Sequence, residues 1–148
     1  MLLRPHHLID IIAGIGRSDE IKAHDYGHAV HLVMQKVLDN SCGRIKLIAA
    51  ADDICGPCVH LQKNKKCDDL ITSLKPPLSK QQYNDKLDRR LFKFLNFPEG
   101  KIMVLSEFLE IINKNIEETC VICTHPGEDS LEKAEAVKKG ITLLGQKK

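Results

Sequence analysis

The sequence predicts a mainly α-helical protein with a minor β element, an α+β domain with cysteine-rich loops. Apolar residues recur at helical spacing in most long segments. Short apolar runs between them, such as Arg44–Ala50, have the length of strands. With 148 residues, the chain has the ordinary length of one domain. We therefore expect residues 1–148 to form a single compact domain.

The first predicted elements lead toward the cysteines. Pro5 suits the first turn of a helix, and the apolar residues that follow it predict a helix to about Gly14. A second helix is expected from near Asp25, and the turn residues Asn40–Gly43 end it. The run Arg44–Ala50 then reads as a strand that feeds directly into a polar, cysteine-containing loop.

The second half begins with the clearest helix signal in the chain. Ser79 followed by Gln82 is typical of a capping box, and apolar residues on one face predict a long helix after it. A short strand is expected at Ile102–Val104. Ser106 can cap a further helix that buries apolar residues as far as Ile116.

Two further features lie near the C-terminus. A pair of cysteines, Cys120 and Cys123, is expected to follow the Ser106 helix directly. A last helix is predicted from Ser130, and Gly140 is its weakest point because glycine is a poor helix former.

Composition and charge exclude several classes of protein. The chain has 22 lysines and arginines against 20 aspartates and glutamates, which is too balanced to indicate a nucleic-acid partner or a membrane surface. The apolar run Leu8–Ile15 is short and contains Asp10, so it predicts neither a secretory signal nor a membrane span. We expect a soluble, cytoplasmic protein.

The cysteines are the most informative residues of the sequence. Thiols in a reducing cytosol are more often metal ligands or catalysts than structural disulfides. One group lies in the loop "ADDICGPCVHLQKNKKCDD", a second group lies in "CVIC", and one cysteine stands apart in a predicted turn without special chemistry. In that order they are Cys55, Cys58 and Cys67, then Cys120 and Cys123, then Cys42.

The first pair is spelled Cys-Gly-Pro-Cys, the active-site motif of thioredoxins, in which a lowered thiolate pKa drives disulfide exchange. The chain lacks the neighbouring tryptophan and the alternating strands and helices of that fold. A charged loop, instead of an apolar helix, follows the motif. A metal site accounts for more of the cysteines than a redox dithiol does.

Two cysteine pairs can together offer four thiolates, which suit either a tetrahedral zinc ion or an iron–sulfur cluster. A zinc site built from the two pairs leaves Cys67 unexplained. A cluster can instead draw three ligands from the first loop and one from the second pair. This arithmetic favours an iron–sulfur cluster, with Zn²⁺ as the alternative.

The stretches "LRPHHL", "ADDICGPCVHL", "LDRRLFKFL" and "CVIC" together resemble a family of small prokaryotic proteins described as candidate iron–sulfur-binding proteins. The resemblance covers most of the chain and implies a cluster, which we expect to be of the 4Fe–4S type. Asp52 and Asp53 can be solvated caps or turn residues, or, as the resemblance suggests, can accept hydrogen bonds that lock the first loop. The family often has a further cysteine after the second pair, where this chain has His125. The implied ligands, in some combination, are Cys55, Cys58, Cys67, Cys120 and Cys123.

Several other side chains are candidates for the site. Arg4, His6 and His7 belong to the family-like opening and are candidate catalytic residues, although polar residues in a first helical turn need no function. His60 and His125 each lie two residues beyond a cysteine pair and are candidate accessory ligands, although loop polarity explains them equally well.

Three function classes remain. The first is an iron–sulfur protein that transfers electrons to a redox partner protein or senses redox state. The second is an iron–sulfur enzyme, in which an iron with an open coordination position binds a small-molecule substrate. The third is a structural zinc protein that acts as an interaction module. The sequence leaves open whether the protein is an enzyme.

Overall fold

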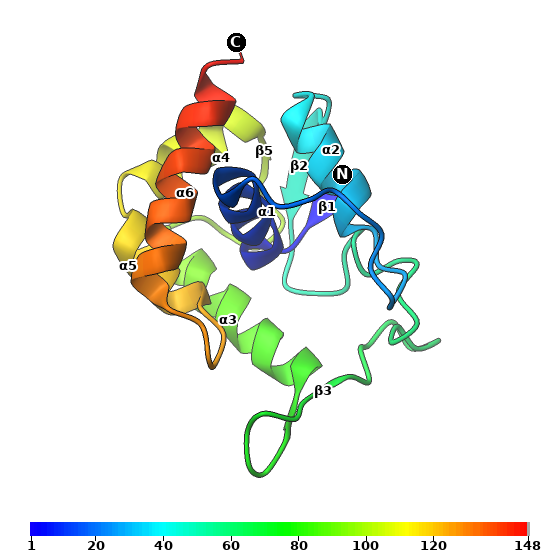
Figure 1. The fold of residues 1–148 in the computed structure, drawn as a ribbon. Helices are drawn as coiled ribbons and strands as arrows, with labels where there is room; N and C mark the ends of the chain where they lie inside the picture. Colours follow the sequence, from blue (N-terminus) through cyan, green and yellow to red (C-terminus); the bar gives the residue numbers. More distant parts are fainter. Residues whose placement is uncertain (148) are drawn as a thin grey trace.

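Helix α1 (Pro5–Arg17) is the central element of the fold (Figure 1). In this computed structural model, which describes residues 1–147, most α1 side chains are buried. Helices α2, α3 and α6 pack directly on α1, while α4 and α5 pack against α6. The surrounding helices are α2 (Val30–Leu38), α3 (Lys80–Phe94), α4 (Leu105–Asn113), α5 (Ile116–Cys123) and α6 (Ser130–Gly145).

Two small sheets accompany the helices. In the first, β2 (Arg44–Leu47) lies between β1 (Leu2–Leu3), to which it is parallel, and β5 (Ile102–Val104), to which it is antiparallel. The second consists of the antiparallel strands β3 (Leu70–Ile71) and β4 (Leu78–Ser79). Pairing of β1 with β2 brings the start of α1 beside the chain that leaves β2 for the cysteine loop.

Two glycines let α1 and α6 approach closely. A Cβ atom on Gly140 would overlap the backbone carbonyl of Ile12, and one on Gly16 would overlap that of Ala136. Gly140, which weakens the helix in isolation, is therefore required where the two helices cross. The close packing of α1 on α6 therefore explains the glycine at position 140, although glycine has a low helix propensity.

The predicted fold class is confirmed, and residues 1–147 form one α+β domain; Lys148, the end of the predicted domain, lies outside the described residues. The first helix begins at Pro5 as predicted and continues to Arg17. The Ser79 hydroxyl accepts a hydrogen bond from the Gln82 amide at 3.3 Å, which confirms the predicted cap of α3. No helix within residues 1–147 has the length and apolar character needed to cross a membrane.

The predicted start of the second helix was wrong. Helix α2 begins at Val30 instead of near Asp25. The Tyr26 carbonyl accepts from the Val59 amide, and the Ala29 amide donates to the Ile54 carbonyl, each at 2.9 Å. These residues use their backbone groups to bind the cysteine loop, so those groups are not available to a helix.

The prediction for the Ser106 helix also needs correction. Helix α4 begins at Leu105, so Ser106 lies inside it, and the Glu107 side chain accepts from the Val104 amide at 2.9 Å. The helix ends at Asn113, and a separate helix, α5, begins at Ile116. The second cysteine pair lies inside α5, not in a loop after a helix.

Replacing Gly140 with alanine should destabilise the protein, because the new methyl group must push α1 and α6 apart. We expect a loss of about 1–3 kcal/mol in the free energy of unfolding, as for overpacked cores. Gly145→Ala is the matched control, since that position in α6 has nothing within 4 Å of the added Cβ. Urea denaturation measures both variants. Equal stabilities for the two would contradict the proposed role of Gly140 in the helix crossing.

Candidate metal centre

A cavity of about 250 Å³ lies where the N-terminal end of α1, the start of α3 and the cysteine loop (residues 51–69) meet. Tyr26 and His28, which lie in the segment between α1 and α2, also contribute to its wall. Thiols and imidazoles are the two groups that bind soft and borderline metal ions best in proteins. Three of each line the cavity: Cys55, Cys58 and Cys67, with His7, His28 and His60.

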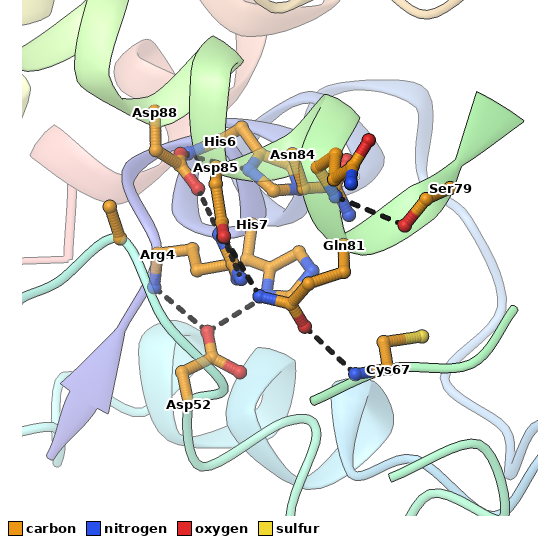
Figure 2. A network of polar contacts seen from close by, with 12 residues as sticks. Arg4, His6, His7, Asp52, Cys67, Ser79, Gln81, Asn84, Asp85 and Asp88 are labelled. Atoms are coloured by element: carbon orange, nitrogen blue, oxygen red, sulfur yellow. Dashed lines mark hydrogen bonds and ion pairs between the residues drawn. The ribbon is translucent and has the colours of Figure 1, made fainter. Parts of the chain in front are cut away.

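The cysteine loop folds back on itself and so brings its three thiols to one cavity. Tight turns join the Cys58 amide to the Cys55 carbonyl and the Leu61 amide to the Cys58 carbonyl. An isolated antiparallel bridge pairs Leu61 with Cys67, and residues 62–66 form the exposed tip between them. The Cys67 amide donates to the side-chain oxygen of Gln81 at 2.8 Å, which anchors the end of the loop to α3 (Figure 2).

The buried carboxylate of Asp52 joins this loop to the start of the chain. Its Oδ1 accepts from the amides of Ile54 and Cys55 at 3.0 and 3.1 Å. Its Oδ2 accepts from the Arg4 amide at 2.8 Å and from His7 Nδ1 at 2.7 Å (Figure 2). These four bonds use all the acceptor positions of a carboxylate, so Asp52 is an organising residue and not a free metal ligand. The expectation that Asp52 locks the loop is confirmed.

The charge of Asp52 is strongly stabilised. Burial alone would raise the pKa of Asp52, but the charge and hydrogen bond of His7 and the Arg4 amide outweigh burial and lower the pKa to about 2. Burial likewise opposes protonation of His7, yet the charge of Asp52 raises the pKa of His7 above its usual value. The two groups therefore favour a charged pair in the metal-free protein.

A second buried network holds Arg4 and His6. The Arg4 guanidinium donates to Asp88 at 2.8 Å and to Asp85 at 2.7 Å, and His6 Nδ1 lies 2.9 Å from Asp88 Oδ1. Burial lowers the pKa of His6, although its hydrogen bond to Asp88 acts in the opposite direction. Arg4 and His7 line the cavity, whereas His6 faces Asp88 and does not line it.

Asp88 was not identified as a site residue from the sequence, although its position on an apolar helix face indicated a buried, paired carboxylate. It lies on α3 three residues before Leu91 and four before Phe92, both of which are buried. A carboxylate on the apolar face of a helix is rarely unpaired. Residues of the first turns of α3 were missed as well, since nothing in the sequence shows that they line the cavity; they are Lys80, Gln81 and Asn84.

The accessory candidates have different surroundings. His60 lines the cavity, and its Nδ1 lies 2.8 Å from a carboxylate oxygen of Asp68, which is half exposed. His125 does not line the cavity, but its Nε2 lies 3.3 Å from Oδ1 of Asn84, which does. Neither observation tests whether these imidazoles bind metal.

The second cysteine pair lies elsewhere. Cys120 and Cys123 are completely buried on α5 and do not line the cavity. Figure 1 shows α5 and the cysteine loop on opposite sides of α1. The Cys123 thiol donates to the Cys120 carbonyl at 3.9 Å. The neighbouring thiol lowers the pKa of Cys120 and, together with burial, raises that of Cys123. Their membership of the same ligand set as the loop cysteines stays a prediction.

Two of the loop thiols, Cys55 and Cys67, are poor nucleophiles. Burial and the nearby Asp52 charge raise the pKa of Cys55 to about 12, and burial raises the pKa of Cys67. Thioredoxin-like exchange requires the opposite shift, because the thiolate is the attacking species. A bound metal ion, in contrast, displaces the thiol proton directly.

The spacing of the donor atoms distinguishes the types of metal site. Among the described residues, one trio of His, Cys, Asp or Glu side chains has donor atoms that all lie within 4.8 Å of one another: His7, Asp52 and Cys55. At least one pair of the three thiols of the cavity therefore lies more than 4.8 Å apart, further than the sulfurs of a tetrahedral zinc site, which lie about 3.8 Å apart.

Asp52→Asn should destabilise the metal-free protein at neutral pH. A pKa lowered from 3.8 to about 2 corresponds to stabilisation on the order of 2 kcal/mol above the unfolded-state pKa. This contribution disappears as the pH falls through the folded pKa, so the difference between the variant and the parent should shrink between pH 4 and pH 2. Denaturant unfolding across this range is the measurement.

Asp53→Asn serves as the matched control, because Asp53 is an exposed neighbour that accepts one bond, from the Leu2 amide. Its variant should lose less stability. A pH-independent loss in Asp52→Asn would show that the charge of Asp52 has no part in holding the loop.

Comparison with known proteins gives one match. No curated protein and no solved structure matched the chain. A family model described as "Protein of unknown function (DUF1284)" matches residues 23–126, which include all five loop and α5 cysteines and exclude Arg4, His6 and His7. Since the match covers more than half of the sequence, the chain belongs to the DUF1284 family.

Proposed function

We propose that this protein binds an iron–sulfur cluster in the cavity and has a redox or electron-transfer role. The observation that supports this most directly is that Cys55, Cys58 and Cys67 come from one short loop and line one cavity of about 250 Å³. Cysteine thiolates are the usual ligands of such clusters. When bound, a cluster accepts and releases single electrons.

The spacing of the thiols favours a cluster over a zinc ion. Thiolates that share one zinc must come close together, whereas thiolates of a cluster bind different irons and stay further apart. At least one pair of sulfur atoms among Cys55, Cys58 and Cys67 is more than 4.8 Å apart. They therefore fit a centre of several metal atoms better than a single ion, and Zn²⁺ becomes the alternative that metal analysis tests.

The thiols lie close to the surface, beside an ion pair of the cavity wall. The Lys80 ammonium and Asp69 both line the cavity and lie 2.8 Å apart, and the hydrogen bond and charge of Asp69 raise the pKa of Lys80 despite its partial burial. Little protein covers Cys58 on its outer side, since the neighbouring residues Pro57 and Val59 are exposed. A centre placed here would have a short path to a partner protein.

One observation favours an enzyme as the second candidate. The cavity wall also contains hydrogen-bonding side chains that do not anchor the cysteine loop, namely Asn84 and Tyr26. Three loop thiols leave one iron of a 4Fe–4S cluster without a cysteine from the same loop. An iron in that position can bind a small molecule as a Lewis acid, and the polar wall can then orient the molecule.

Protein purified without oxygen should contain iron and acid-labile sulfide, and Cys58→Ser should reduce both. We expect the variant to bind the cluster about tenfold more weakly or worse, since even residues that only support ligands contribute this much. Thermal stability should fall with iron content, because metal binds only the folded protein. Iron, sulfide and zinc analysis together with thermal denaturation are the measurements.

Cys42→Ser is the control, because Cys42 is a buried cysteine that does not line the cavity. Its iron content should match the parent's. Stoichiometric zinc without iron or sulfide in the parent protein would exclude both iron–sulfur functions. Serine variants of Cys120 and Cys123 test the α5 pair: iron loss equal to that of Cys58→Ser would place it in the ligand set.

A further inference from the structure

His7 differs from the other histidines in how firmly its ring is held. It lies in the first turn of α1, and its Nδ1 is 2.7 Å from Asp52 Oδ2. The His7 side chain is 20% exposed, and the Asp52 side chain is completely buried. Asp52 is itself fixed by three backbone amides, so the ring cannot turn without breaking a saturated carboxylate network.

This contact determines which ring nitrogen is available. An ionised carboxylate only accepts hydrogen bonds, so Nδ1 of His7 carries a proton and donates it to Asp52. The other nitrogen, Nε2, has no hydrogen-bond partner among residues 1–147. Because His7 lines the cavity together with the three loop thiols and its Nδ1 is bound to Asp52, Nε2 is the nitrogen left for an occupant of the cavity.

We propose that His7 Nε2 is the non-cysteine ligand of the centre held by Cys55, Cys58 and Cys67. This inference rests on the proposed cluster. A histidine that binds metal through one nitrogen commonly donates its other N–H to a carboxylate, which orients the ring and increases its basicity. Asp52 and His7 have this arrangement. Asp52 also accepts from the amide of Cys55, so one carboxylate positions both the imidazole and a thiol.

The other two cavity histidines are less suited to this role. His60 also has a carboxylate partner, but Asp68 is 52% exposed and lies near the solvent-exposed loop tip. Among residues 1–147, the buried Nδ1 of His28 has no hydrogen-bond partner, so no carboxylate fixes the tautomer of this ring. Of the three, only His7 is oriented by a buried carboxylate.

Pulsed electron paramagnetic resonance on the reduced, cluster-loaded protein tests this assignment without any assay of activity. Protein labelled with ¹⁵N in its histidines should show nitrogen coupling of the strength of a directly bound imidazole. His7→Gln should retain iron and sulfide, because the three loop thiolates still hold the cluster, and should lose this coupling.

His60→Gln is the competing variant, since it removes the other carboxylate-bound imidazole of the cavity, and His31→Gln controls for loss of a histidine outside the cavity. Both should keep the coupling. If His7→Gln does not fold, as judged by circular dichroism, Asp52→Asn provides the second variant and should weaken or change the coupling.

Several results would overturn the assignment. Loss of the coupling in His60→Gln but not in His7→Gln would assign the ligand to His60. A cluster-loaded parent without strong nitrogen coupling would leave the cluster in place and remove the histidine ligand. A parent without iron and sulfide would overturn the cluster as well, so the two failures are distinguishable.

Discussion

The carboxylate of Asp52 accepts hydrogen bonds from both segments that form the core of the candidate site. One segment is the start of α1, through the Arg4 amide and the His7 ring, and the other is the cysteine loop, through Ile54 and Cys55. A buried carboxylate with fewer partners would destabilise the folded protein. With four donors, the charge is stabilised and the side chain is held in one position. The positions of His7 and Cys55 relative to each other depend on this one side chain.

The Arg4–Asp88 contact extends the same principle to α3. The Arg4 amide binds Asp52, and the Arg4 side chain binds Asp85 and Asp88. This one residue therefore connects the cysteine loop to α3, which supplies part of the cavity wall. Removing either partner of such a buried pair leaves an uncompensated charge. The two N-terminal histidines contact the same two carboxylates: His6 binds Asp88, and His7 binds Asp52.

Local patterns in the sequence were sufficient for the starts of α1 and α3, but not for α2, α4 and α5. The apolar spacing after Pro5 and the Ser79 cap each depend on residues within a few positions, and both were predicted correctly. The pairings of the site are not local. His7 and Asp52 are 45 residues apart, and Arg4 and Asp88 are 84 apart, so no spacing rule reveals them. Strands of two residues, such as β1, are too short to show alternation.

Anomalous diffraction at the iron absorption edge, from crystals grown without oxygen, is the most direct test that the loop cysteines hold a metal centre. Our account predicts iron density inside the cavity, in contact with the sulfurs of Cys55, Cys58 and Cys67. Iron density beside Cys120 and Cys123 on α5 without contact with the loop sulfurs, or a metal signal only at the zinc edge, would contradict it.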